Sequence, residues 1–116
     1  MQIRFFSIVA AASLTLGLFS FSPALAADED PTVAQIYQAF RAGHLAEAQG
    51  MLDRVLRDHP NSAKAHFVQA EIDAAEGHKD LARAELARAE QLKPGLPDVK
   101  PRAVKALKQK LGLPAD

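Results

Sequence analysis

The 116-residue sequence predicts an all-α fold: a short solenoid of two helical hairpins with a capping helix at its C-terminal end, preceded by a cleavable signal peptide. Apolar residues recur at helical spacing along residues 31–111, and no stretch alternates with the period of two that marks a β-strand. The sequence also repeats itself at a fixed interval, with glycine or proline where helices are expected to end. These observations indicate one domain of helical repeats.

Residues 1–26 have the order of a secretory signal peptide. Arg4 is the only charged residue before Asp28, and the apolar run that follows it ends at Pro23. The small-x-small sequence Ala24-Leu25-Ala26 then matches a cleavage site. We expect cleavage after Ala26 and export of residues 27–116 to the periplasm or the medium. The alternative is a retained membrane anchor, because the apolar segment is just long enough to span a bilayer.

An internal repeat appears when the sequence is compared with itself. When it is shifted so that Gln35 meets Gln69, identical residues coincide at seven positions. Several of these are glycine, histidine or proline, so alanine richness does not explain them. The matching pairs are Gln35 and Gln69, Gly43 and Gly77, His44 and His78, Ala48 and Ala82, Leu52 and Leu86, Arg54 and Arg88, and Pro60 and Pro94.

The first unit, about residues 29–62, has the pattern of a helical hairpin. Asp30 is expected to cap the first helix, with Pro31 at the first helical position. Gly43 and His44 form the turn, and Pro60 ends the second helix. Each helix carries one apolar stripe: Val33, Ile36, Tyr37 and Phe40 on the first, and Leu45, Ala48, Leu52 and Val55 on the second.

The second unit, about residues 63–96, repeats this plan, with Ser62 as the expected cap and Gly77 and His78 at the turn. Its first helix is apolar on two faces, so it should be packed from two sides. These faces are Phe67, Ala70 and Ala74, and Val68, Ile72 and Ala75. The second helix carries Leu81, Ala82, Leu86, Ala89 and Leu92 and ends before Pro94.

The third element, about residues 97–112, is expected to cap the last repeat. A proline-rich connector leads into a helix near residues 101–111, whose apolar stripe is Val104, Leu107 and Leu111.

Charge is uneven along the chain. Residues 27–92 carry 7 basic and 12 acidic side chains, a net of −5, whereas residues 93–111 carry 6 basic and 1 acidic, a net of +5. The basic patch is Lys100, Arg102, Lys105, Lys108 and Lys110.

Three interpretations of the basic patch stay open. It could bind anionic membrane or an acidic partner, or dock on an acidic face of a second copy. The simpler interpretation is a solvated face on a capping helix whose C-terminal end favours cations. Because export is expected, we predict no nucleic-acid partner.

The repeats resemble the tetratricopeptide repeat, and in particular its small exported bacterial members, which the segment at residues 58–66 resembles. The 34-residue period, the glycine turn, Ala-x-x-x-Leu on the second helix and proline at the boundary carry this resemblance. The second-helix signature occurs twice, as Ala48, Leu52 and Pro60 and as Ala82, Leu86 and Pro94. The family's first-helix signature is replaced by Thr32, Gln35, Ile36 and Ala39, and by His66, Gln69, Ala70 and Asp73.

The resemblance implies a non-enzymatic adaptor or scaffold that binds a protein or peptide segment on the concave surface formed by the first helices. The implied surface residues are Val33, Tyr37, Phe40, Arg41, Lys64, Phe67, Glu71 and Ala74. For Phe40 and Phe67 the alternative is a place in the core, whereas Tyr37 is expected to be exposed. The family's clamp for a C-terminal carboxylate has asparagine at the positions held here by Tyr37 and Glu71, so that mode of binding is not expected.

Catalysis, cofactors and metals are not expected. Cysteine is absent, and the sequence contains neither a Gly-x-Ser-x-Gly elbow nor a phosphate-binding glycine loop. The carboxylates Glu71, Asp73 and Glu76 are spread around one helix. The four histidines outside the signal segment are not spaced for a zinc or di-iron site. They are His44, His59, His66 and His78.

Two repeats make a short solenoid, because such arrays generally need three or more units for stability. We therefore expect either a marginally stable monomer or completion of the array by another chain. A structural subunit that self-associates is the second functional hypothesis, and attachment to anionic membrane through the basic patch is the third.

Overall fold

A computed structural model describes residues 30–115, which form an all-α fold without β-strands in that part of the chain. The predicted signal peptide lies outside the described residues. The helices are α2 (Val33–Arg41), α3 (Leu45–Asp58), α4 (Ala63–Ala75), α5 (Lys79–Leu92) and α6 (Pro101–Lys110). The all-α prediction is therefore confirmed.

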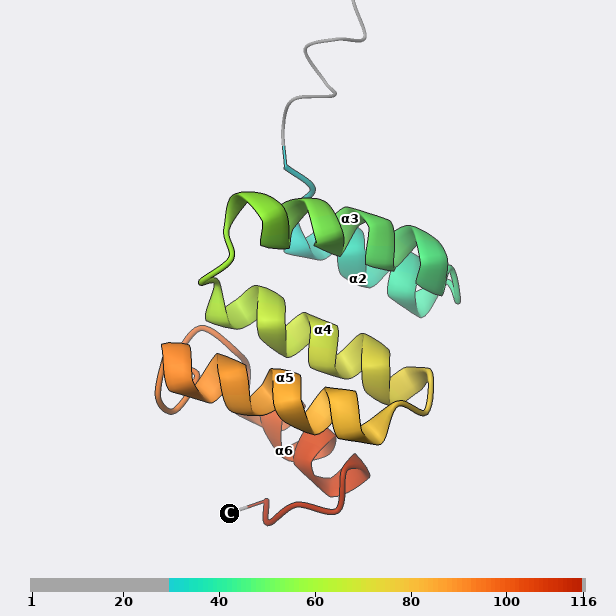
Figure 1. Cartoon of the computed structure of the whole chain (residues 1–116). Coiled ribbons are helices and arrows are strands. Elements are labelled where there is room, and N and C mark those ends of the chain that lie inside the picture. The colour runs from blue at the N-terminus through green and yellow to red at the C-terminus, as the bar shows by residue number, and fades with distance from the viewer. Residues whose placement is uncertain (1–29, 116) are drawn as a thin grey trace, which may run out of the picture.

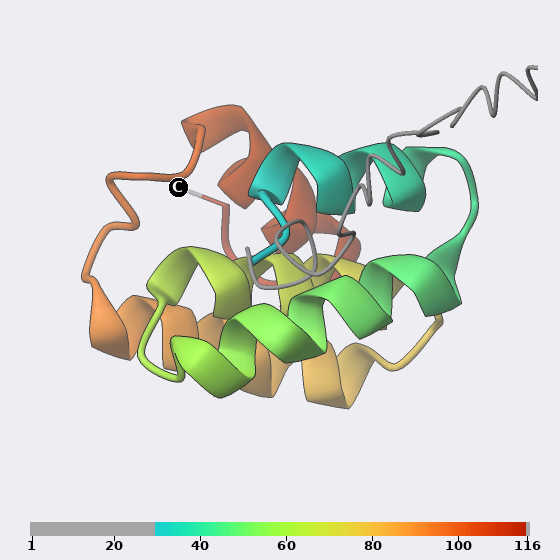
Figure 2. The same ribbon diagram turned by 90° about the horizontal axis from the view of Figure 1, so that it is seen from above.

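The helices form a layered stack (Figure 1). The pair α2 and α3 comes first, α4 follows and contacts α3, and α5 and α6 complete the other end. Seen along the stack, α2 and α6 lie on one side and α3 and α5 on the other, with α4 between them (Figure 2). The arrangement is that of a helical-repeat-like fold in which α4 is central.

The two hairpins turn in the same way. Gly43 and Gly77 have φ angles of 81° and 82°, a left-handed conformation that favours glycine. In each turn the next residue, His44 or His78, donates its N–H to a carbonyl of the preceding helix, at 2.9 Å and 2.8 Å. Both predicted turns are confirmed, with nearly identical backbone geometry in the two hairpins.

One predicted helix cap is wrong and another is correct. Thr32, not Asp30, caps α2: its hydroxyl accepts from the Gln35 N–H at 3.2 Å, and the Gln35 side chain accepts the Thr32 N–H at 2.8 Å. This reciprocal box satisfies two backbone donors, whereas a cap by Asp30 alone would satisfy fewer. Asp30 instead pairs with His59 at 2.9 Å. Ser62 caps α4 as predicted.

Helix α4 is packed from both sides, as its two apolar faces predicted. Ala65, Val68 and Ile72 join the core with α2 and α3. Phe67, Ala70 and Ala74 join the other core cluster, with α5, α6 and the connector.

For two residues, the prediction of a place in a buried apolar stripe is wrong. Leu81 is 58% exposed, and Ala75 is also exposed. Leu81 lies about 100° around α5 from the buried Ala82 and is turned toward solvent.

The C-terminal element closes one end of the stack. Leu107 and Leu111 are buried in the cluster with α4 and α5. The connector, for which the sequence predicted no packing role, adds the buried Leu96 and Val99. The Arg83 guanidinium on α5 donates two hydrogen bonds to the Leu111 carbonyl, at 2.9 Å and 3.2 Å, and so satisfies the C-terminal end of α6.

Among residues 30–115, no helix has both the length and the apolar character needed to cross a membrane.

Candidate protein-binding site

The predicted binding residues Tyr37, Arg41 and Glu71 come together where side chains of α2 and α4 meet. The Tyr37 hydroxyl donates a hydrogen bond to Glu71 Oε1, and Arg41 Cζ lies 5.9 Å from the centroid of the Tyr37 ring. Tyr37 and Glu71 are 34 residues apart and so occupy corresponding positions in the two hairpins. We call these three residues the Tyr37 cluster.

Burial controls the electrostatics of the Tyr37 cluster. Tyr37 and Glu71 are both half-buried. Desolvation raises the pKa of Glu71, while the hydrogen bond from Tyr37 and the charge of Arg41 act in the opposite direction. Desolvation also raises the pKa of Tyr37, and the hydrogen bond to Glu71 adds to this effect. The expectation that Tyr37 is exposed is wrong, because Glu71 supplies the partner that its hydroxyl needs.

The remaining predicted surface residues separate into accessible and inaccessible ones. Lys64 is exposed, and Val33 and Phe40 are partly buried against the core of the first hairpin. Phe67 is 0% exposed and Ala74 is 5% exposed, because α5, α6 and the connector pack over that face of α4. For Phe67 the core alternative is therefore correct, and neither Phe67 nor Ala74 can contact a partner on this surface.

A polar link between α3 and α4 was missed in the sequence analysis. The side-chain amides of Gln49 and Gln69 exchange two hydrogen bonds, of 2.7 Å and 2.8 Å. Each amide also donates to an aspartate one turn further along its own helix, Gln49 to Asp53 and Gln69 to Asp73. The Gln-x-x-x-Asp spacing, present in both helices, was the available signal.

The basic patch is only partly packed against the rest of the fold. Lys108 is half-buried and forms an ion pair of 3.1 Å with Glu90 on α5. The other members, Lys100, Arg102, Lys105 and Lys110, are exposed. Lys100 and Arg102 line a hollow of about 590 Å³ at the start of α6, together with Pro101, Ala103 and Ala106.

The histidines do not converge. His44 pairs with Glu47, His78 with Glu76, and His59 with Asp30. The ring nitrogens of His66 lie 2.7 Å from Glu85 Oε2 and 2.8 Å from the Pro60 carbonyl oxygen, which connects α4 to α5 and to the loop before α4. In the described part of the chain, no group of three or more histidine, cysteine, aspartate or glutamate side chains is placed to hold a metal ion.

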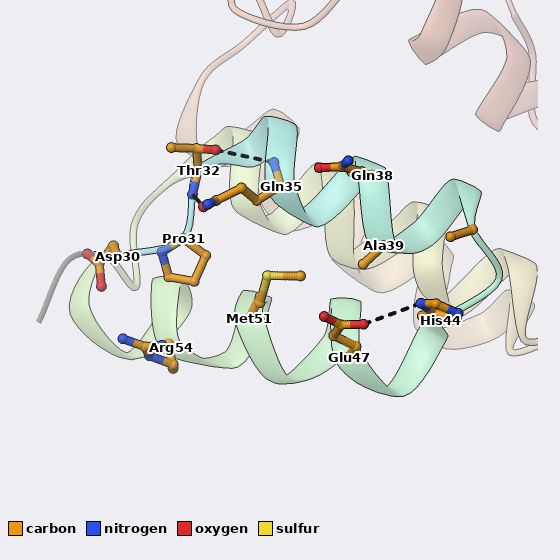
Figure 3. A pocket seen from close by; sticks show the side chains of 11 residues that line it. Asp30, Pro31, Thr32, Gln35, Gln38, Ala39, His44, Glu47, Met51 and Arg54 are labelled. Carbon is orange, nitrogen blue, oxygen red and sulfur yellow. Dashed lines mark hydrogen bonds and ion pairs between the residues drawn. The ribbon is translucent and has the colours of Figure 1, made fainter. Parts of the chain in front are cut away.

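A further hollow of about 650 Å³ lies between α2 and α3, on the side of the first hairpin away from α4 (Figure 3). We call it the outer hollow. Its lining from α3 includes Glu47, Met51 and Arg54, whereas Gln49 on the opposite side of α3 bonds α4. The residues that line it are Asp30, Pro31, Thr32, Gln35, Gln38, Ala39, Ala42, His44, Glu47, Met51 and Arg54.

Comparisons of the chain with models of protein families, with curated proteins and with solved structures find no match.

Proposed function

We propose that this chain is a non-enzymatic protein-interaction module, exported after cleavage near Ala26. It would be built from two tetratricopeptide-like repeats, about residues 29–62 and 63–96, with a capping segment at about 97–112. The matching turns at Gly43 and Gly77 support the repeat interpretation. The burial of Leu107 of α6 in one core cluster with residues of α4 and α5 supports the capping role.

The observation that carries the proposal is the Tyr37 cluster, which spans corresponding positions of adjacent hairpins. Glu71 uses one oxygen to accept from Tyr37, and its carboxylate has further lone pairs for N–H donors of a bound segment. The exposed Arg41 offers donors for backbone carbonyls. A peptide segment laid across α2 and α4 would therefore find both donors and acceptors, with aromatic surface between them.

Site-specific photocrosslinking in intact cells tests this function. A photoreactive residue at Lys64, exposed on α4, should give a protein adduct, whereas one at Ala87, exposed on α5, should not. Adding Glu71→Gln to the Lys64 probe should lower the adduct yield about tenfold, because a hydrogen bond to a charged group is replaced by a weaker one. Equal adducts at both positions, or a yield unaffected by Glu71→Gln, would contradict the proposal.

A further inference from the structure

The two ends of the stack differ in what covers them. At one end, α6 and the connector pack on α4 and α5 through Leu96, Val99, Leu107 and Leu111. At the other end, the outer hollow opens on α2 and α3. None of the helices α4, α5 and α6 lies over this end of the stack (Figure 1).

The second hairpin indicates what kind of element the outer hollow can accept. Gln35 and Gln38 line the hollow, and their counterparts in the second hairpin are Gln69 and Ile72. In the second hairpin that side is covered by α3: Ile72 shares a core cluster with Leu52 and Val55, and Gln69 bonds Gln49. The corresponding side of the first hairpin is therefore shaped to receive a helix.

Helix α3 presents a self-complementary stripe along the outer hollow. Glu47, Gly50, Met51 and Arg54 follow the spacing i, i+3, i+4 and i+7, so they share one face. Figure 3 shows Met51 between the oppositely charged Glu47 and Arg54. Both charges are equally distant along the sequence from the midpoint between Gly50 and Met51.

Gly50 has no role within the chain that would require glycine. It lies inside α3, where glycine costs about 1 kcal/mol relative to alanine. A Cβ atom built at this position would have nothing within 4 Å. A helical glycine at the centre of the stripe would allow another helix to approach closely.

We propose that the outer hollow is the interface of a two-fold homodimer in which α3 packs antiparallel to α3 of a second copy. A two-fold axis at the midpoint places the exposed Glu47 of each copy opposite the exposed Arg54 of the other, so opposite charges face each other twice across the interface, in addition to the contacts that both residues make within their own chain. It also brings Gly50 and Met51 of the two copies together. With the cleavage after Ala26 that we propose above, only residues 27–29 would precede Asp30, too short a segment to fill a hollow of about 650 Å³.

This interface is separate from the Tyr37 cluster and stands whether or not that cluster binds a partner. It uses the side of α3 that faces away from α4, whereas the cluster lies between α2 and α4. The dimer would leave both proposed binding surfaces available.

Charge reversal tests the dimer, with the processed chain studied by sedimentation velocity over a wide range of concentrations. The native chain should dimerise. Glu47→Arg and Arg54→Glu should each raise the dimer dissociation constant at least tenfold, because like charges then face each other across the axis. The double variant should recover most of the affinity. Residues 47 and 54 are about 10 Å apart along one helix, so the recovery must come from pairing between copies.

Two further variants complete the test, with far-UV circular dichroism to check that each variant folds. Gly50→Gln should keep the monomer fold, because the position is open, and should weaken the dimer. Arg88→Glu, at the corresponding position of α5, should leave the dimer unchanged. The proposal is overturned if the native chain is a monomer at every concentration, or if the double variant does not recover dimer affinity. It is also overturned if Lys105→Glu disrupts the dimer and Arg54→Glu does not.

Discussion

The two hairpins have corresponding turns but differ in how completely they are packed. Only Ile36 and Ala39 are buried on α2, whereas α4 is buried along both of its apolar faces. The difference follows from their neighbours, since α4 lies between α3 on one side and α5 with α6 on the other. Burial at a repeat position therefore depends on what packs against it as well as on the residue present.

Corresponding polar positions show the same dependence. Gln69 bonds Gln49 across the contact between hairpins, whereas Gln35, its counterpart, completes the cap of its own helix. The first hairpin lacks a preceding helix in the described chain, so Gln35 has local partners only. The outer hollow lies at this same position.

Phenylalanine truncation should give the largest difference between the hairpins. Phe67 on α4 is fully buried, so Phe67→Ala should lower the free energy of unfolding by about 3–5 kcal/mol. Phe40 on α2 is only half-buried, so Phe40→Ala should cost about 1–2 kcal/mol. Urea denaturation followed by circular dichroism measures both values. Equal losses would show that α2 and α4 are equally packed in solution, contrary to the comparison.

The turns should give matched and smaller effects. Gly43→Ala and Gly77→Ala each force alanine into a left-handed conformation, at about 1–2 kcal/mol. Neither new Cβ atom would meet another atom within 4 Å, so the backbone alone sets the loss. The two losses in thermal or urea unfolding should agree within about 0.5 kcal/mol. A clear inequality would mean that the turns differ in solution despite their matching φ angles.

The sequence was sufficient for the parts of the fold that depend on local chemistry. Gly43 and Gly77 marked the turns, Ser62 marked a cap, and the two apolar faces of α4 indicated packing from both sides. The cap at Asp30 was predicted wrongly because Thr32 and Gln35 form a reciprocal pair that involves two side chains. Which of two neighbouring residues caps a helix depends on the local backbone geometry, and residue types alone do not determine that geometry.

The candidate site was predicted only in part. The sequence placed Tyr37, Arg41 and Glu71 on one surface, but the hydrogen bond between Tyr37 and Glu71 depends on the distance between α2 and α4. Phe67 was assigned to the same surface as an alternative to the core, and its burial depends on the position of α6 and the connector. Contacts that depend on how a capping element closes over the repeat could not be read from periodicity.

The smallest effect on the free energy of unfolding should come from the paired Gln–Asp contacts of the two hairpins. Burial, together with the charges of Glu85 and Glu76, raises the pKa of Asp73, although the hydrogen bond from Gln69 opposes this. An ionised carboxylate at this position therefore disfavours the folded state at neutral pH. As pH falls, folded Asp73 takes up its proton before the unfolded chain does, and the penalty disappears.

Asp73→Asn keeps an acceptor for Gln69 and removes the charge, so it should stabilise the fold at pH 7 by about 0.5 kcal/mol. This advantage over the native chain should shrink as pH is lowered toward the ordinary carboxyl range near 4. Asp53→Asn is the matched control, because Asp53 accepts from Gln49 in the same i, i+4 geometry but is exposed. Urea midpoints for both variants between pH 4 and pH 7 measure the effect. A gain in stability that is independent of pH, or that is equal for Asp53→Asn, would contradict this prediction. It would mean that burial on α4 does not raise the pKa of the Asp73 carboxyl.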